Sequence, residues 1–117
     1  MARLTTHVLD TARGKPAAGM AIALSIRDGD GFRLLKTTVT NGDGRTDEPL
    51  IAGDRLTAGV YELTFAAGAY FRGLGEPLPS PPFLDEVAIR FGIADAEGNY
   101  HVPLLVSPYG YSTYRGS

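Results

Sequence analysis

Hydrophobic and polar residues alternate in short runs along most of this chain. Between residues 60 and 65, for example, Tyr61, Leu63 and Phe65 alternate with Glu62 and Thr64. Successive side chains of a strand point to opposite faces, so this alternation predicts half-buried β-strands. The pattern predicts strands over residues 4–10, 21–27, 32–40, 60–65, 86–93 and 100–107, and a last strand that follows residues 108–110 and ends at residue 117.

Turn and breaker residues separate these predicted strands. Residues 28–31 (DGDG) predict the tight turn of a hairpin, and residues 41–44 (NGDG) end its second strand. Residues 66–74 lack the alternation and predict one short helix. The prolines of residues 77–82 exclude regular structure from the next loop. The weakest signal is a short edge strand around residues 50–52.

Seven or eight short strands and a single helix predict an all-β fold, an antiparallel β-sandwich. The chain has 117 residues, which is enough for one domain and too few for two ordinary ones. It contains no internal repeat, low-complexity segment or linker. Residues 1–117 are therefore expected to form a single domain.

Two segments predict that the sandwich associates with copies of itself. Residues 100–107 offer apolar side chains to both faces of their strand, and an apolar outer face is usually covered by another subunit. The segment after it carries Tyr109, Tyr111 and Tyr114, and tyrosine is enriched at interfaces. An oligomer is therefore expected.

Composition narrows the possible partners. Hydrophobic residues make up 44% and charged residues 21%, a globular balance, and the net charge of −2 argues against a nucleic-acid or anionic-membrane partner. The absence of cysteine excludes disulfides, thiol catalysis and thiolate metal sites. No run resembles a signal peptide or approaches the ~18 apolar residues of a membrane span, so a cytoplasmic protein is expected.

Only two histidines are present, His7 and His101, and both fall within predicted strands. Each can be a partly buried side chain that hydrogen-bonds a backbone carbonyl. Each can also transfer protons, because the ordinary pKa of imidazole, about 6.5, suits acid–base chemistry near neutrality. Both interpretations stay open from the pattern alone.

Arg45 follows the bend of residues 41–44 and also has two interpretations. It can be a solvated turn residue, or its fork of donors can bind the oxygens of a carbonyl or urea-like substrate. Other chemistries lack the residues they need. A zinc site would need a third ligand, and no serine lies in a Gly-x-Ser-x-Gly motif.

Taken together, these segments resemble the transthyretin-like (prealbumin-like) family over essentially the whole chain. The resemblance rests on residues 4–10 (LTTHVLD), 14–17 (GKPA), 40–45 (TNGDGR), 68–71 (GAYF), 101–108 (HVPLLVSP) and 111–117 (YSTYRGS). The family has a hormone-carrying branch and a branch that hydrolyses 5-hydroxyisourate. The hydrolase branch is marked by residues that match His7, Arg45, His101 and the terminal Tyr114, Arg115, Gly116 and Ser117.

The resemblance implies two four-stranded sheets, a homotetramer built as a dimer of dimers, and active sites in the channel between dimers. The implied reaction of urate degradation opens a ring amide of 5-hydroxyisourate to give 2-oxo-4-hydroxy-4-carboxy-5-ureidoimidazoline, with no metal or organic cofactor. His7 and His101 would transfer protons, Arg45 would hold substrate oxygens, and Tyr114, Arg115, Gly116 and Ser117 would line the pocket. Which histidine is the base stays open, with His101 favoured.

Two alternatives from other classes remain. One is a transthyretin-type carrier that binds a hydrophobic ligand in the central channel without chemistry. The other is a structural or carbohydrate-binding sandwich, although the chain has no tryptophan for a flat sugar-binding face.

Overall fold

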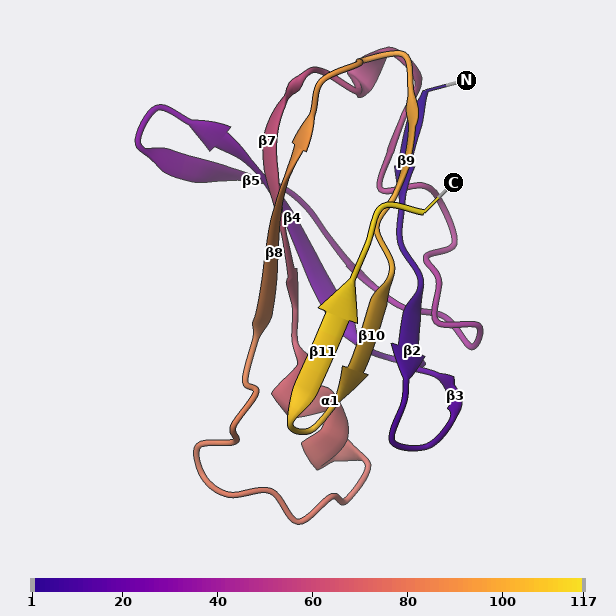
Figure 1. Ribbon diagram of the computed structural model, residues 1–117, viewed down its shortest axis with the longest axis vertical. Coiled ribbons are helices and arrows are strands. Elements are labelled where there is room, and N and C mark those ends of the chain that lie inside the picture. Colours follow the sequence, from indigo (N-terminus) through magenta and orange to yellow (C-terminus); the bar gives the residue numbers. More distant parts are fainter. Residues whose placement is uncertain (1, 117) are drawn as a thin grey trace.

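The computed structural model describes residues 2–116, which form two β-layers packed face to face (Figure 1). The strands are β1 (Arg3–Thr5), β2 (Val8–Asp10), β3 (Lys15–Pro16), β4 (Ala21–Asp28), β5 (Gly31–Val39), β6 (Ile51–Ala52), β7 (Gly59–Phe65), β8 (Val87–Ile93), β9 (Asn99–His101), β10 (Leu104–Ser107) and β11 (Gly110–Thr113). The helices are a 3-10 turn, η1 (Gly53–Arg55), and α1 (Ala67–Gly73). The predicted hairpin, short helix and edge strand are therefore all confirmed.

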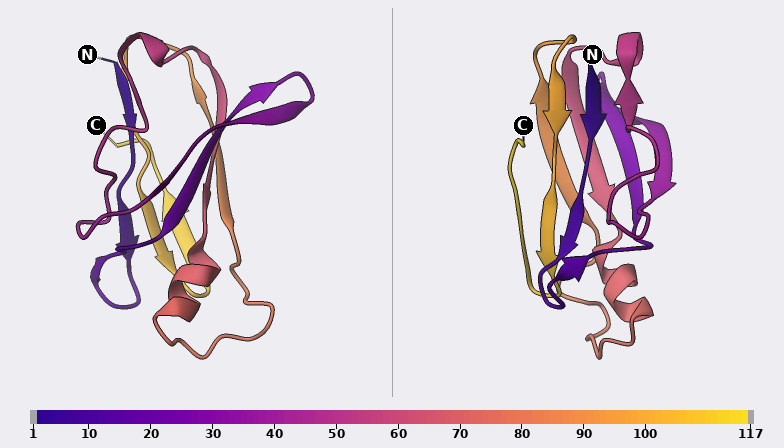
Figure 2. Two further views of the ribbon diagram at one scale, coloured as in Figure 1. Left: turned by 180° about the vertical axis from the view of Figure 1, so that it is seen from behind. Right: turned by 90° about the vertical axis from the view of Figure 1, so that its right-hand side faces the viewer.

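One layer is a regular antiparallel sheet in the order β5-β4-β7-β8. The other layer consists of a four-stranded sheet, β11-β10-β2-β3, and a three-stranded sheet, β6-β1-β9. These two sheets continue each other, because β1 leads into β2 and β9 leads into β10. The right-hand view of Figure 2 shows the two layers edge-on.

The predicted class, an all-β sandwich of four-stranded sheets with one short helix, is confirmed, with one difference in strand pairing. β1 pairs with β9 and β2 pairs with β10 in parallel, so the second layer is mixed. Alternation reports which face a residue occupies and does not report the direction of its neighbouring strand. The alternation of hydrophobic and polar residues therefore could not predict the parallel pairing.

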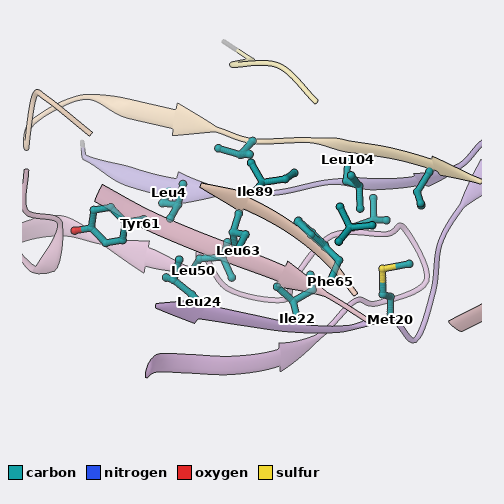
Figure 3. Packing of buried hydrophobic residues seen from close by; sticks show 14 of the residues in the cluster. Leu4, Met20, Ile22, Leu24, Leu50, Tyr61, Leu63, Phe65, Ile89 and Leu104 are labelled. Carbon is teal, nitrogen blue, oxygen red and sulfur yellow. The ribbon is translucent and has the colours of Figure 1, made fainter. Parts of the chain in front are cut away.

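The core lies between the layers and follows the predicted alternation. In β7, Tyr61, Leu63 and Phe65 are buried, and the residues between them are half-buried. Leu4 and Leu104 reach the same core from the opposite layer (Figure 3). Full burial of each such side chain stabilises the fold by about 1.5–3 kcal/mol.

Two of the predicted long strands are interrupted, and both interruptions concern the histidines. Pro103 has no N–H to donate, so the run over residues 100–107 divides into β9 and β10. The run over residues 4–10 divides at His7, because the next N–H, that of Val8, donates to Gly44 O at 2.8 Å instead of to a strand. His101 ends β9, but the prediction that His7 lies within a strand was wrong.

The last strand is shorter than predicted. β11 ends at Thr113, after which Gly116 makes one isolated bridge to His101. Ser117 lies outside the described residues. No helix within residues 2–116 is both long enough and apolar enough to cross a membrane.

Candidate active site

The bend at residues 41–44 packs directly against the break between β1 and β2. Asn41 Oδ1 accepts hydrogen bonds from the backbone N–H groups of Asp43 at 2.9 Å and Arg45 at 3.2 Å. Gly44 is buried with φ of +76°, and a Cβ there would overlap the carbonyl oxygen of Val8. Only glycine fits this close approach. The bend therefore places Arg45 beside the first strand run.

His7 faces this bend. Its Nε2 lies 2.9 Å from the backbone carbonyl oxygen of Asp43. A carbonyl oxygen only accepts hydrogen bonds, so the proton lies on Nε2, and Nδ1 keeps its lone pair in the neutral ring. His7 therefore hydrogen-bonds a backbone carbonyl, as one of its two interpretations expected. Its other ring nitrogen stays available to accept a proton.

His101 is held from two sides. Its Nδ1 lies 2.8 Å from Thr5 Oγ1, across the parallel pair of β1 and β9. Its backbone carbonyl accepts the N–H of Gly116 at 2.7 Å. The first contact joins opposite ends of the chain and the second joins β9 to the tail, and together they leave the ring half-buried on the outer face of the layer.

A cleft of about 600 Å³ brings these groups together. Its walls come from β1, the segment after the bend, and β9: Arg3, Thr5, Thr6, Arg45, Thr46, Asp47, Glu48, Pro49, Asn99 and His101. His7 does not line the cleft itself, but it lies near enough for its protonated form to lower the pKa of His101. Arg45 and His101 therefore share one cleft, with His7 next to it.

The surroundings of His101 favour its neutral form. Burial lowers its pKa most, followed by the charges of Arg45 and His7, whereas a hydrogen bond with the Thr5 backbone raises it. A neutral imidazole at neutral pH can accept a proton. Arg45 is exposed, and neither ion pair found within residues 2–116 involves it. The N–H donors of its guanidinium are therefore available to bind an anionic or carbonyl group.

The predicted tail residues do not all lie at this cleft. Tyr114 and Arg115 line a separate groove of about 240 Å³, where the Arg115 guanidinium lies 4.2 Å from the centre of the Tyr100 ring. Arg115 also donates to Asn99 O at 3.2 Å, which ties the tail to β9. Of the four terminal residues, Gly116 contacts His101, and Ser117 lies outside the described residues.

Replacement of Gly116 with alanine is expected to lower activity without unfolding the chain. A Cβ at this position would lie 2.6 Å from His101 Cδ2, so the imidazole would have to move. A catalytic group displaced by about 1 Å costs up to roughly a hundredfold in rate. The matched control is Gly110→Ala, whose Cβ would make only an ordinary contact with Ser107 Oγ at 3.9 Å. Equal turnover in both variants, measured with the same substrate, would show that the wall formed by Gly116 does not matter.

Sequence reasoning missed Thr5, Arg3 and Asn99 as cleft residues. Thr5 lies beside His101 because β1 and β9 pair in parallel, and no local sequence pattern predicts that pairing. Within residues 2–116, no three His, Asp or Glu side chains gather closely enough to hold a metal ion.

Comparison with known proteins gives a consistent result. A sequence model described as "HIUase/Transthyretin family" matches residues 4–116. A 5-hydroxyisourate hydrolase of Mesorhizobium japonicum is 66% identical over 98% of this chain and 92% of its own length. The solved 5-hydroxyisourate hydrolase of Klebsiella pneumoniae is 38% identical, with a TM-score of 0.83 over all of both chains. Sea bream transthyretin in complex with thyroxine is 32% identical, with a TM-score of 0.85 over 97% of this chain and 94% of its own.

Proposed function

Because this chain belongs to the HIUase/Transthyretin family, we infer that it is a hydrolase of urate degradation that acts on 5-hydroxyisourate. The observation that carries this inference is the joint presence of Arg45 and His101 in one cleft, with His7 beside it, in a chain 66% identical to a protein of that name. We assign these three side chains to the chemistry.

The carrier alternative has less support. A shared fold does not decide between a carrier and an enzyme, so the decision rests on the site. Identity to the solved transthyretin is 32%, about half of the identity to the hydrolase of Mesorhizobium japonicum. A cleft with an exposed guanidinium and a neutral imidazole suits a small polar substrate better than an apolar hormone.

The proposed reaction begins with water. One imidazole takes a proton from the water while the water oxygen adds to the ring carbonyl carbon of 5-hydroxyisourate. The carbonyl oxygen becomes negatively charged, the ring C–N bond then breaks, and the imidazolium returns its proton to the leaving nitrogen. The product is 2-oxo-4-hydroxy-4-carboxy-5-ureidoimidazoline, and no atom or electron is left over.

The three side chains divide this work. His101 lines the cleft and its surroundings lower its pKa, so we assign it the proton transfer from water, with His7 as the second imidazole beside it. General acid–base catalysis of this kind contributes about 10²–10⁴-fold. Arg45 would bind the developing oxyanion through two parallel donors, which a lysine ammonium cannot do.

The pKa of His101 provides a test of this electrostatic arrangement. Nuclear magnetic resonance titration of its ring should give a pKa below the ordinary value of 6.5. In Arg45→Gln the pKa should rise, because loss of a neighbouring cation makes protonation easier. Arg33→Gln is the control, since Arg33 lies on the β5 hairpin and pairs with Asp28. An unchanged pKa in Arg45→Gln would show that the two groups do not interact.

We propose further that the chain acts as a homotetramer in the cytoplasm and that its tail serves the site from an interface. Tyr109, Tyr111 and Tyr114 are 63%, 48% and 60% exposed in the single chain, which suits side chains that another copy would cover. β11 is the edge strand of its sheet. In this arrangement Tyr114, Arg115, Gly116 and Ser117 would line the substrate pocket.

One experiment separates the hydrolase from the carrier. The ultraviolet absorbance of freshly generated 5-hydroxyisourate is followed with and without a small fraction of an equivalent of protein. The hydrolase consumes many equivalents faster than the spontaneous decay. A carrier leaves the decay at its spontaneous rate, and that result would exclude the proposed function.

A further inference from the structure

Thr5 is the direct neighbour of His101 across the two strands that form the cleft wall. The two residues are Cα partners in the parallel ladder between β1 and β9, so their side chains leave the sheet on the same face. Both are half-buried and both line the cleft.

The backbone around Thr5 is firmly placed. The Thr5 carbonyl accepts the N–H of Val102 at 2.9 Å. The next residue, Thr6, is 2% exposed and donates its hydroxyl to the Val102 carbonyl at 2.7 Å. These two bonds clamp the end of β1 to the residue that follows His101. The Thr5 hydroxyl is therefore presented to the imidazole from a fixed position.

The contact itself is a hydrogen bond of 2.8 Å between Thr5 Oγ1 and His101 Nδ1. A hydroxyl can donate or accept, so the bond is compatible with two ring tautomers. If Oγ1 donates, the Nδ1 lone pair is consumed and the neutral ring carries its proton on Nε2. If Oγ1 accepts, the proton lies on Nδ1 and the Nε2 lone pair is free.

We propose that Thr5 is a positioning residue for the reaction: its hydroxyl oxygen accepts a hydrogen bond from Nδ1–H of His101, and this keeps Nε2 unprotonated for the substrate water. The proposal rests on the function proposed above, because only a base needs a free lone pair at that nitrogen.

His7 provides a useful contrast. Its ring is held through Nε2 by the Asp43 carbonyl, which leaves Nδ1 free. The two imidazoles would therefore be fixed in opposite tautomers by two different partners. Neither partner takes part in a bond-making or bond-breaking step of the proposed reaction. Each acts by choosing which nitrogen of its histidine carries the proton.

Thr5→Val tests the proposal, because valine keeps the β-branched shape and removes the hydroxyl. We expect kcat to fall about tenfold, the rate equivalent of one net hydrogen bond, with KM nearly unchanged. Thr5→Ser restores the hydroxyl and should restore most of kcat. Thr11→Val is the matched control, since Thr11 Oγ1 donates to the Val106 carbonyl and Thr11 does not line the cleft.

The tautomer is read directly from ¹⁵N chemical shifts of the His101 ring. Wild-type protein and Thr5→Ser should show a protonated Nδ1 and an unprotonated Nε2, and Thr5→Val should move the proton toward Nε2. A wild-type ring with its proton on Nε2, or an unchanged kcat in Thr5→Val, would overturn the proposal. Failure of the wild-type protein to consume 5-hydroxyisourate would instead overturn the proposed function, and the ¹⁵N shifts would still decide the tautomer.

Discussion

Asparagine in place of His101 is expected to lower the turnover of 5-hydroxyisourate by about 10²–10⁴-fold, the range that general acid–base catalysis contributes. Asparagine has polar atoms near the position of Nδ1, so it can keep a hydrogen bond to Thr5 Oγ1. It cannot take up a proton at neutral pH. The expected loss therefore falls on the chemical step and on kcat.

The fold should survive this change. His101 is half-buried at the end of β9, and its backbone bonds to Gly116 and the parallel ladder remain. Circular dichroism and thermal unfolding of His101→Asn should match the wild-type protein. Stopped-flow absorbance measures the rate, and a folded variant with near-normal turnover would remove His101 from the chemistry.

Lysine in place of Arg45 is expected to lower kcat/KM by about 10²–10³-fold, the usual cost of losing an oxyanion donor, although the charge is kept. The guanidinium is exposed at the cleft and forms neither of the ion pairs within residues 2–116. Its loss should therefore cost little stability. The deficit reflects geometry, because an ammonium cannot present two parallel donors to a tetrahedral intermediate.

The matched control for this change is Arg33→Lys. Arg33 pairs with Asp28 at the exposed hairpin, at 3.4 Å, where ion pairs contribute little. In steady-state kinetics, Arg33→Lys should turn over substrate at the wild-type rate, whereas Arg45→Lys should not. If Arg45→Lys were as active as Arg33→Lys, Arg45 would be only a solvated turn residue with no part in the reaction.

Much of the fold follows from local pattern. The alternation in β7 predicted which of its side chains are buried, because period two leaves only two faces to choose between. The DGDG turn predicted the hairpin of β4 and β5, since glycine and aspartate favour tight turns. The bend before Arg45 followed from the same chemistry, and there Gly44 has positive φ.

The geometry of the site was harder to predict from the local sequence pattern, because it depends on contacts between segments that are distant in the sequence. His7 and His101 were singled out as the only imidazoles of the chain. That His101 lines a cleft next to His7 depends on the parallel pairing of β1 with β9. For the tail, the prediction grouped residues that the single chain places apart. The resemblance grouped its four residues, whereas in the single chain Tyr114 and Arg115 line another groove.

A double-mutant cycle tests the central claim, that Arg45 and His101 act on one substrate in one cleft. The rates of wild-type protein, Arg45→Lys, His101→Asn and the double variant are measured with 5-hydroxyisourate under one set of conditions. Groups that serve the same transition state give strongly non-additive losses, so the double variant should be little slower than the slower single variant. A double variant whose loss equals the product of the two single losses would show that the two groups work independently, and would contradict the account.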